Sequence, residues 1–287
     1  MQPAPAPRTA VTQAYARLAE VLPGLAVTEL SPAAPLPRED GWITAAALAE
    51  GGGGLDAFLA WDEEQVVRDY GQRARPDVIA SFGLHRYAWP ACLLITVPWL
   101  LLRRVPRYPV THVSYSRTVP GLSMGGIAVR PGSFACLPGD PAAALPGATV
   151  VADETALRAE VRAAVAEHLE PVLAGFGPRM RRRGRALWGM ATDEVVEGLD
   201  HVGLLLGEQE RARRELELLL PGATEPYVGS AAFRAPAGPA ADGAQPTRDR
   251  VSCCMFYTVR PEDICANCPR LCDARRTPAK PTALAAP

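Results

Sequence analysis

Hydrophobic residues recur every three to four positions along much of this 287-residue chain, which is the period of an amphipathic α-helix. Leu157 and every fourth residue through Leu169 form one such apolar stripe, and Gly175 is expected to end that helix. Asp40 is predicted to cap an earlier helix, because a short acidic side chain satisfies free N–H groups at a helix start. The pattern predicts helices over residues 9–22, 40–49, 55–74, 76–104, 153–173, 192–206 and 208–220.

The period changes between residues 110 and 137, where apolar and small polar residues alternate around Val113 and Tyr115. Alternation of this kind is typical of short, half-buried strands. Two Pro-Gly pairs in the same segment supply turns. We therefore expect a small antiparallel sheet here, and the predicted fold class is α+β, mostly helical.

The longest apolar run, residues 88–102, is interrupted by Pro90 and Pro98. It is shorter than the roughly 20 residues that a transmembrane helix requires, so it is predicted to be a buried helical segment. The chain is expected to divide into four parts by composition and cysteine content. These are a body at 1–222, a Pro/Ala/Gly-rich linker at 223–247, a cysteine module at 248–276 and a tail at 277–287.

Net charge is −1, so no general basic field favours nucleic acid as a partner. The first residues lack a basic stretch followed by an apolar one, and we therefore expect no secretory signal and a cytoplasmic location. No transmembrane segment is expected, while peripheral membrane contact stays open. In a reducing cytoplasm disulfides are uncommon and thiolate metal sites persist.

Five of the seven cysteines lie in the predicted cysteine module, and four follow the pattern Cys253-Cys254, ten residues, Cys265, two residues, Cys268. Thiolates are soft ligands that suit zinc or an iron–sulfur cluster. Neighbouring side chains of an extended strand point to opposite faces, so the adjacent pair can share a site only where the backbone bends. The spacing alone leaves open a zinc site, a [2Fe–2S] cluster and a [4Fe–4S] cluster that uses Cys272.

This motif, with Phe256-Tyr257 after the pair and Cys268-Pro269 at its end, resembles the FhuF-like ferric-siderophore reductases. The resemblance implies a [2Fe–2S] cluster held by Cys253, Cys254, Cys265 and Cys268. It also implies one-electron reduction of siderophore-bound Fe(III), with electrons from a partner such as a ferredoxin or a flavin reductase. The specific similarity covers roughly the last 40 residues, and the body matches only in general character.

A dense basic run at Arg181, Arg182, Arg183 and Arg185 is a candidate surface for a ferric siderophore, with the hydroxamate type favoured, or for an acidic electron donor. Trp188 and His168 are further candidates for that surface. The alternatives are a solvated helix start, a core tryptophan and a structural histidine.

Two other functions stay open. The module could be a zinc-stabilised binding module without redox activity, or the body could be related to siderophore synthetases. The sequence contains no GxSxG motif, no dinucleotide-binding fingerprint and no P-loop. Their absence weakens the hypotheses that the protein is a hydrolase, a nicotinamide-dependent enzyme or an ATP-dependent enzyme. Within the cysteine module, arginines exceed acids, so Arg250 and Arg270 are expected to stabilise a reduced cluster.

Overall fold

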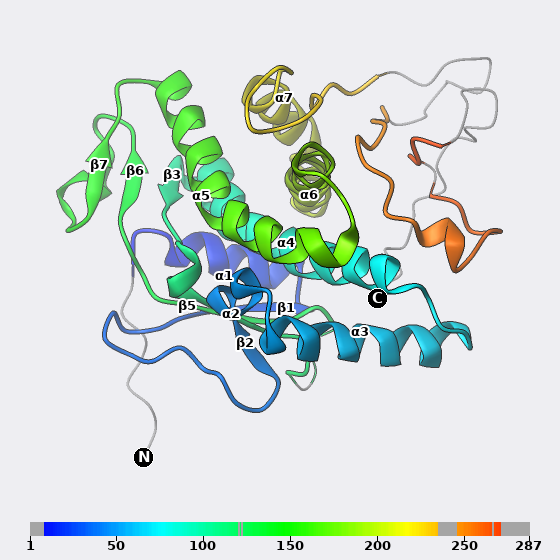
Figure 1. The fold of residues 1–287 in the computed structure, drawn as a ribbon. Coiled ribbons are helices and arrows are strands. Elements are labelled where there is room, and N and C mark those ends of the chain that lie inside the picture. The colour runs from blue at the N-terminus through cyan, green and yellow to red at the C-terminus, as the bar shows by residue number, and fades with distance from the viewer. Residues whose placement is uncertain (1–8, 120, 122, 235–245, 266, 271–287) are drawn as a thin grey trace.

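The computed structural model describes residues 9–119, 121, 123–234, 246–265 and 267–270 (Figure 1). Helices dominate, and together with two small sheets they confirm the α+β, mostly helical class. The helices are α1 (Thr12–Val21), α2 (Ala45–Glu50), α3 (Gly53–Tyr70), α4 (Pro76–Leu102), α5 (Glu154–Met180), α6 (Gly184–Leu205) and α7 (Gln209–Leu219). Short 3₁₀ turns are η1 (Val110–His112), η2 (Pro141–Ala144) and η3 (Phe256–Thr258).

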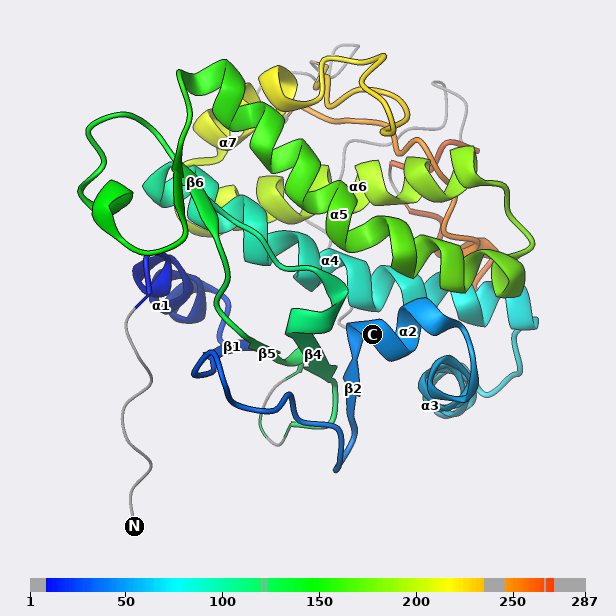
Figure 2. The ribbon, with the colours of Figure 1, turned by 60° about the vertical axis from the view of Figure 1, so that its left-hand side comes forward.

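Helix α4 is the central element, and it packs against both α5 and α6 (Figure 2). It is long and apolar enough to cross a membrane by length and composition, but 83% of its apolar window is buried inside the protein. Pro90 and Pro98 lie within the helix. The prediction of a buried helical segment is therefore confirmed for residues 88–102.

Four strands form a mixed sheet beneath the long helices, in the order β1-β5-β4-β2. They are β1 (Leu25–Glu29), β2 (Trp42–Thr44), β4 (Val113–Ser116) and β5 (Gly125–Val129). Strand β4 pairs antiparallel with β5 and β2, as predicted for residues 110–137, whereas β1 joins β5 in parallel. A second sheet has the order β3-β6-β7, with strands β3 (Arg104–Pro106), β6 (Phe134–Cys136) and β7 (Ala148–Val150).

Several helix ends differ from the sequence predictions. Asp40 is not an N-cap: it lies in a turn with φ of 55°, and the Thr44 hydroxyl accepts from Ala47 N at 3.2 Å to cap α2. Gly175 does not end α5, which continues to Met180. A Cβ at residue 175 would lie 2.3 Å from the Leu48 carbonyl oxygen, so this glycine permits close packing of α5 on α2.

The predicted start of α6 at residue 192 or 193 is also wrong, because the helix begins at Gly184. Thr192 and Asp193 are polar residues of the kind that cap helices, yet both are buried within α6. The Thr192 hydroxyl donates to Trp188 O at 2.9 Å, and Asp193 accepts hydrogen bonds from the cysteine module. Their polarity therefore reflects contacts made across the fold and not a helix start.

The first part of the predicted linker lies on the body. Tyr227 is buried and its hydroxyl donates to Arg162 O at 2.7 Å, while Ala231 N donates to Leu220 O at 2.8 Å. Arg234 and Thr247 then pair as an isolated β-bridge. The remaining linker residues 235–245, Cys272 and the predicted tail lie outside the described residues. The division into four parts therefore stays a prediction.

Candidate metal centre

The cysteine module docks on α4 and α6, as the orange segment of Figure 1 shows. Ser81 of α4 donates its hydroxyl to Cys254 O at 3.2 Å. One turn of η3 places Phe256 against Phe82, with ring centroids 6.1 Å apart, and buried Val259 packs with apolar residues of α3 and α4. The thiols are thereby positioned by contacts with the body as well as by their own short loop.

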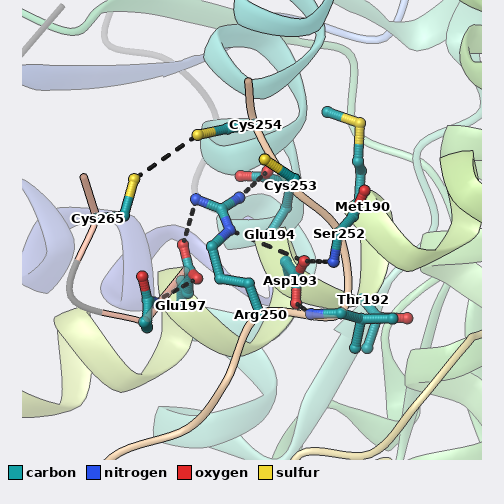
Figure 3. A network of polar contacts seen from close by, with 12 residues as sticks. Met190, Thr192, Asp193, Glu194, Glu197, Arg250, Ser252, Cys253, Cys254 and Cys265 are labelled. Atoms are coloured by element: carbon teal, nitrogen blue, oxygen red, sulfur yellow. Dashed lines mark hydrogen bonds and ion pairs between the residues drawn. The ribbon is translucent and has the colours of Figure 1, made fainter. Parts of the chain in front are cut away.

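The four thiols lie close together as two pairs. Cys254 Sγ and Cys265 Sγ are 3.7 Å apart (Figure 3), and the neighbouring Cys268 thiol adds to the effect of burial in raising the pKa of Cys253. Met255 has a φ of 67°, in the left-handed region, so the chain bends directly after the adjacent cysteines. This bend lets Cys253 and Cys254 face a common site despite their adjacency.

Hydrogen bonds and charge shift the thiol pKa values in opposite directions. A hydrogen bond from Cys265, with help from the Arg250 charge, lowers the pKa of Cys254 to about 5, although burial opposes the change. The same hydrogen bond and burial raise the pKa of Cys265. The lowered pKa favours the thiolate form of Cys254, which is the form that binds metal.

Asp193 of α6 anchors the chain just before the cysteines. Its side chain is fully buried and accepts hydrogen bonds from Val251 N at 2.9 Å and Ser252 N at 2.8 Å (Figure 3). Arg248 Nη1 lies 2.8 Å from the same carboxylate and is also buried. Burial raises the pKa of Asp193, and Arg248, Arg250 and the two amide groups oppose that rise.

Arg250 lies beneath the thiols and is surrounded by acids of α6. Its guanidinium lies 3.4 Å from Glu194 and 3.3 Å from Glu197, with Asp193 at 3.8 Å. The expected arginine excess is therefore offset at Arg250 by carboxylates of the body. Arg270 is the other arginine that was expected to stabilise a reduced cluster. Its guanidinium lies over the Tyr257 ring at 4.3 Å.

Two further groups of this network have pKa values displaced upwards. Burial, together with the charges of Glu194 and Asp193, raises the pKa of Glu197 to about 7 against the effect of Arg250. Burial alone would lower the pKa of His85, but the charge and hydrogen bond of Glu194, at 2.8 Å from Nδ1, raise it. Asn267 also donates to Glu197 at 3.0 Å, which ties the Cys265–Cys268 loop to α6.

The basic run divides into one anchoring residue and three exposed ones. Arg182 donates from Nη2 to Cys253 O at 2.7 Å and from Nη1 to the Ser252 hydroxyl at 3.0 Å. Arg181, Arg183 and Arg185 are exposed around the junction between α5 and α6. Arg182 therefore stabilises the docked module, and its three neighbours form a basic surface next to it.

His168 does not lie on that surface. It is buried, with Nε2 2.8 Å from the Tyr87 hydroxyl and Nδ1 2.7 Å from Tyr108 O. Burial lowers its pKa, so it is a neutral core histidine with both ring nitrogens satisfied. Trp188 is half-buried against Tyr227, with ring centroids 5.4 Å apart, which matches the alternative of a structural tryptophan.

The sequence predictions missed the acidic part of this site, which consists of Asp193, Glu194 and Glu197 together with His85. A signal was present, because two adjacent acids stand in the apolar sequence of α6. Charged residues are almost never fully buried unless they are paired. The partners of these acids, Arg248 and Arg250, lie 55 or more positions away along the chain. Local sequence patterns do not show such contacts.

A family model described as the FhuF 2Fe-2S C-terminal domain matches residues 250–270. The cofactor of this module is a [2Fe–2S] cluster. The match contains all four cysteines of the predicted motif, and the body lies outside it. No curated protein matches the chain.

The described residues fit this cofactor. In the part of the chain that the structure describes, no three His, Cys, Asp or Glu side chains gather around a point suited to a single metal ion. The thiols instead lie as the pairs Cys254–Cys265 and Cys253–Cys268. A two-iron cluster takes four thiolates, two at each iron, so two neighbouring pairs provide a suitable donor set.

Proposed function

We propose that this protein is a cytoplasmic ferric-siderophore reductase whose cluster is held by Cys253, Cys254, Cys265 and Cys268. The bound cluster supplies one electron, which converts siderophore-bound Fe(III) to Fe(II). An electron donor such as a ferredoxin or a flavin reductase then returns one electron to the protein, so the cycle balances. Fe(II) is held less tightly than Fe(III) by hard oxygen ligands, and the metal can leave the chelate.

The observation that carries this proposal is the paired arrangement of thiols in a segment that matches an iron–sulfur domain. Cys253, Cys254 and Cys265 are partly exposed, which suits electron exchange with a molecule outside the fold. Ile264, next to Cys265, is 43% exposed. An apolar side chain beside the ligand loop offers a contact for a docking donor or substrate.

The chain's own residues hold the thiols in place. Asp193 holds the segment just before Cys253, and Arg182 donates a hydrogen bond to the Cys253 carbonyl oxygen. Asn267 ties the Cys265–Cys268 loop to Glu197. Such fixed contacts limit rearrangement when the charge of the site changes, which favours fast electron transfer. Arg181, Arg183 and Arg185 form the proposed surface for an acidic donor.

The ligand assignment is tested by serine variants of protein purified without oxygen. Serine at any of the four cysteines is expected to remove or destabilise the cluster, whereas Cys272→Ser retains colour, iron and sulfide. Loss of the cluster in Cys272→Ser, with retention in Cys254→Ser, contradicts the assignment. Zinc without sulfide in the purified protein would instead establish the zinc-stabilised module.

The reductase activity is tested by mixing chemically reduced protein with a ferric hydroxamate chelate that carries a free carboxylate, in the presence of an Fe(II) trap. We expect one trapped Fe(II) per reduced cluster, and none with the cluster-free Cys254→Ser variant. A fully loaded and reduced protein that leaves the chelate unreduced would overturn the proposed function.

A further inference from the structure

A hollow lies between α3, α4 and the segment that joins β4 to β5. Its walls include Trp61, Trp89, Tyr115 and Met124, and two arginines, Arg86 and Arg117, lie among them. The free space, counted out to its open mouth, is about 440 Å³, but the centre of a water-sized sphere can occupy only about 50 Å³ of it. This space suits one small group, such as a carboxylate at the end of an arm of a larger ligand.

One of the two arginines is fully satisfied by the protein. Arg117 is 6% exposed, and its Nη1 lies 2.5 Å from Oδ1 of the completely buried Asp62. Its Nη2 donates to Phe58 O at 2.9 Å, and its guanidinium lies over the Phe58 and Trp61 rings at 3.6 and 4.3 Å. Asp62 and Arg117 thus neutralise each other within the fold.

The second arginine, Arg86, lacks such well-directed hydrogen bonds. Arg86 is 9% exposed, and its Nε is 2.9 Å from Asp62 Oδ1 without a well-directed hydrogen bond. Its guanidinium also lies over the Trp61 ring at 5.2 Å, and within the described residues Asp62 is its sole ion-pair partner. Two buried guanidinium groups therefore face one carboxylate, and the net charge of the cluster is +1.

Two buried cations that share one anion keep a net positive charge away from water, which is costly, and an anion at the hollow would offset that charge. The planar guanidinium suits two oxygens of a carboxylate or of a catecholate. The tryptophan and tyrosine side chains beside it suit a flat or apolar group that carries the oxyanion. The hollow is thus built for an organic oxyanion and not for a neutral polar group.

Helix α4 joins this hollow to the cysteine module. Phe82, Arg86 and Trp89 occupy positions i, i+4 and i+7, so they share one face of the helix. Phe82 contacts Phe256, two residues after Cys254, with ring centroids 6.1 Å apart. Seven residues of helix span about 10 Å, which places the hollow roughly two turns from the module along α4.

We propose that this hollow binds an oxyanion-bearing arm of the ferric chelate and selects chelates that carry one. The identity of the ligand as a ferric chelate rests on the proposed function. An Fe(III) trihydroxamate has a net charge of +3 − 3 = 0 and offers no such arm. A chelate with hydroxamate ligands fits when it also carries a free carboxylate, and a tricatecholate chelate is favoured by its net charge of +3 − 6 = −3, although its aryl oxygens are bound to the metal.

The test measures binding to the cluster-loaded protein with gallium(III) chelates, which have the charge of the ferric chelates but accept no electron. The probes are a neutral trihydroxamate, a hydroxamate chelate with a free carboxylate, and a tricatecholate. Quenching of tryptophan fluorescence reports binding, because Trp61 and Trp89 line the hollow. We expect the two anionic chelates to bind more tightly, and competition by benzoate shows whether a free carboxylate occupies the hollow.

Arg86→Gln is the variant to compare. Asp62 keeps Arg117 as its counterion, so the fold is expected to persist, while affinity for the anionic chelates falls about tenfold to 100-fold. Arg68→Gln is the matched control on α3, because Arg68 is 65% exposed and pairs only with Asp69. Affinity for the neutral chelate is expected to be unchanged in both variants.

Equal binding of neutral and anionic chelates by the wild-type protein would overturn the inference, and so would unchanged affinity in a folded Arg86→Gln protein. If that variant does not fold, failure of benzoate to compete in the wild-type protein overturns it instead. Binding is read without electron transfer, so its outcome is independent of the reductase assay. Selective binding without reduction counts against the proposed function alone, and reduction without selective binding counts against this inference alone.

Discussion

Replacing Asp193 by asparagine is predicted to release the cysteine module while leaving the body folded. The side chain is completely buried and accepts from Val251 N, Ser252 N and Arg248 Nη1 at 2.8 to 2.9 Å. Asparagine has nearly the same shape but only one acceptor oxygen. Its amide nitrogen would face a donor, and Arg248 would stay buried without its counterion.

The magnitude follows from these contacts. Breaking a buried ion pair from one side costs about 3–5 kcal/mol, which exceeds the 1.5–3 kcal/mol of a single hydrogen bond to a charged group. Burial already raises the pKa of Asp193, so loss of its charge recovers some desolvation free energy and favours the lower limit. A cost of about 3 kcal/mol corresponds to roughly a 100-fold larger population of the undocked module.

The assay is the rate at which an iron chelator bleaches the cluster of anaerobic protein, together with thermal unfolding followed by circular dichroism. We expect bleaching to be faster by about 100-fold in Asp193→Asn. Asp200→Asn is the matched control, because Asp200 lies on the same helix but pairs with Arg213 at 2.7 Å, away from the module. Equal bleaching rates in Asp193→Asn and wild-type protein would refute the anchoring role.

Two further predictions concern contacts of the cysteine module, and a third concerns the packing of α5 on α2. Arg182→Gln is expected to accelerate cluster bleaching about tenfold or more, because two hydrogen bonds to the module are lost, whereas exposed Arg183→Gln leaves the rate unchanged. The pKa of Glu197 is raised to about 7 and the pKa of His85 is also raised, so the folded protein binds protons that the unfolded chain would release. These bound protons stabilise the fold at low pH, and that stabilisation is lost as the pH rises through the raised pKa values. Bleaching should therefore be slower at about pH 6 than at about pH 8, and Glu197→Gln should reduce that difference; the opposite slope would contradict the account. Gly175→Ala is expected to lower the free energy of unfolding by about 1–3 kcal/mol in denaturant titrations, because the new methyl group meets a backbone oxygen of α2.

Local patterns predicted the elements whose causes are local. The apolar stripe of α5 gave the helix, and Asp153 caps it by accepting from Ala156 N at 2.8 Å. The alternation around Tyr115 gave β4. Strand β1, by contrast, was missed, because its parallel pairing with β5 joins residues about 100 positions apart. Periodicity within a segment carries no information on such a partner.

The same distinction holds for the candidate site. The cysteine spacing predicted the ligand loop, since the spacing is a local property of the chain. It did not predict that Arg250 faces three carboxylates of α6, so the expected arginine excess around the cluster was incomplete. Arg86 shows the same limit, because its unsatisfied position depends on the contact of Asp62 with Arg117.

The most direct measurement is freeze-quench electron paramagnetic resonance after reduced protein is mixed with a ferric hydroxamate chelate that carries a free carboxylate. The reduced cluster and the Fe(III) chelate give separate signals. The account predicts that both signals disappear with the same rate constant and in equal amounts, because one electron passes from each cluster to each ferric ion. Persistence of both signals, or loss of the cluster signal while the Fe(III) signal remains, would contradict it.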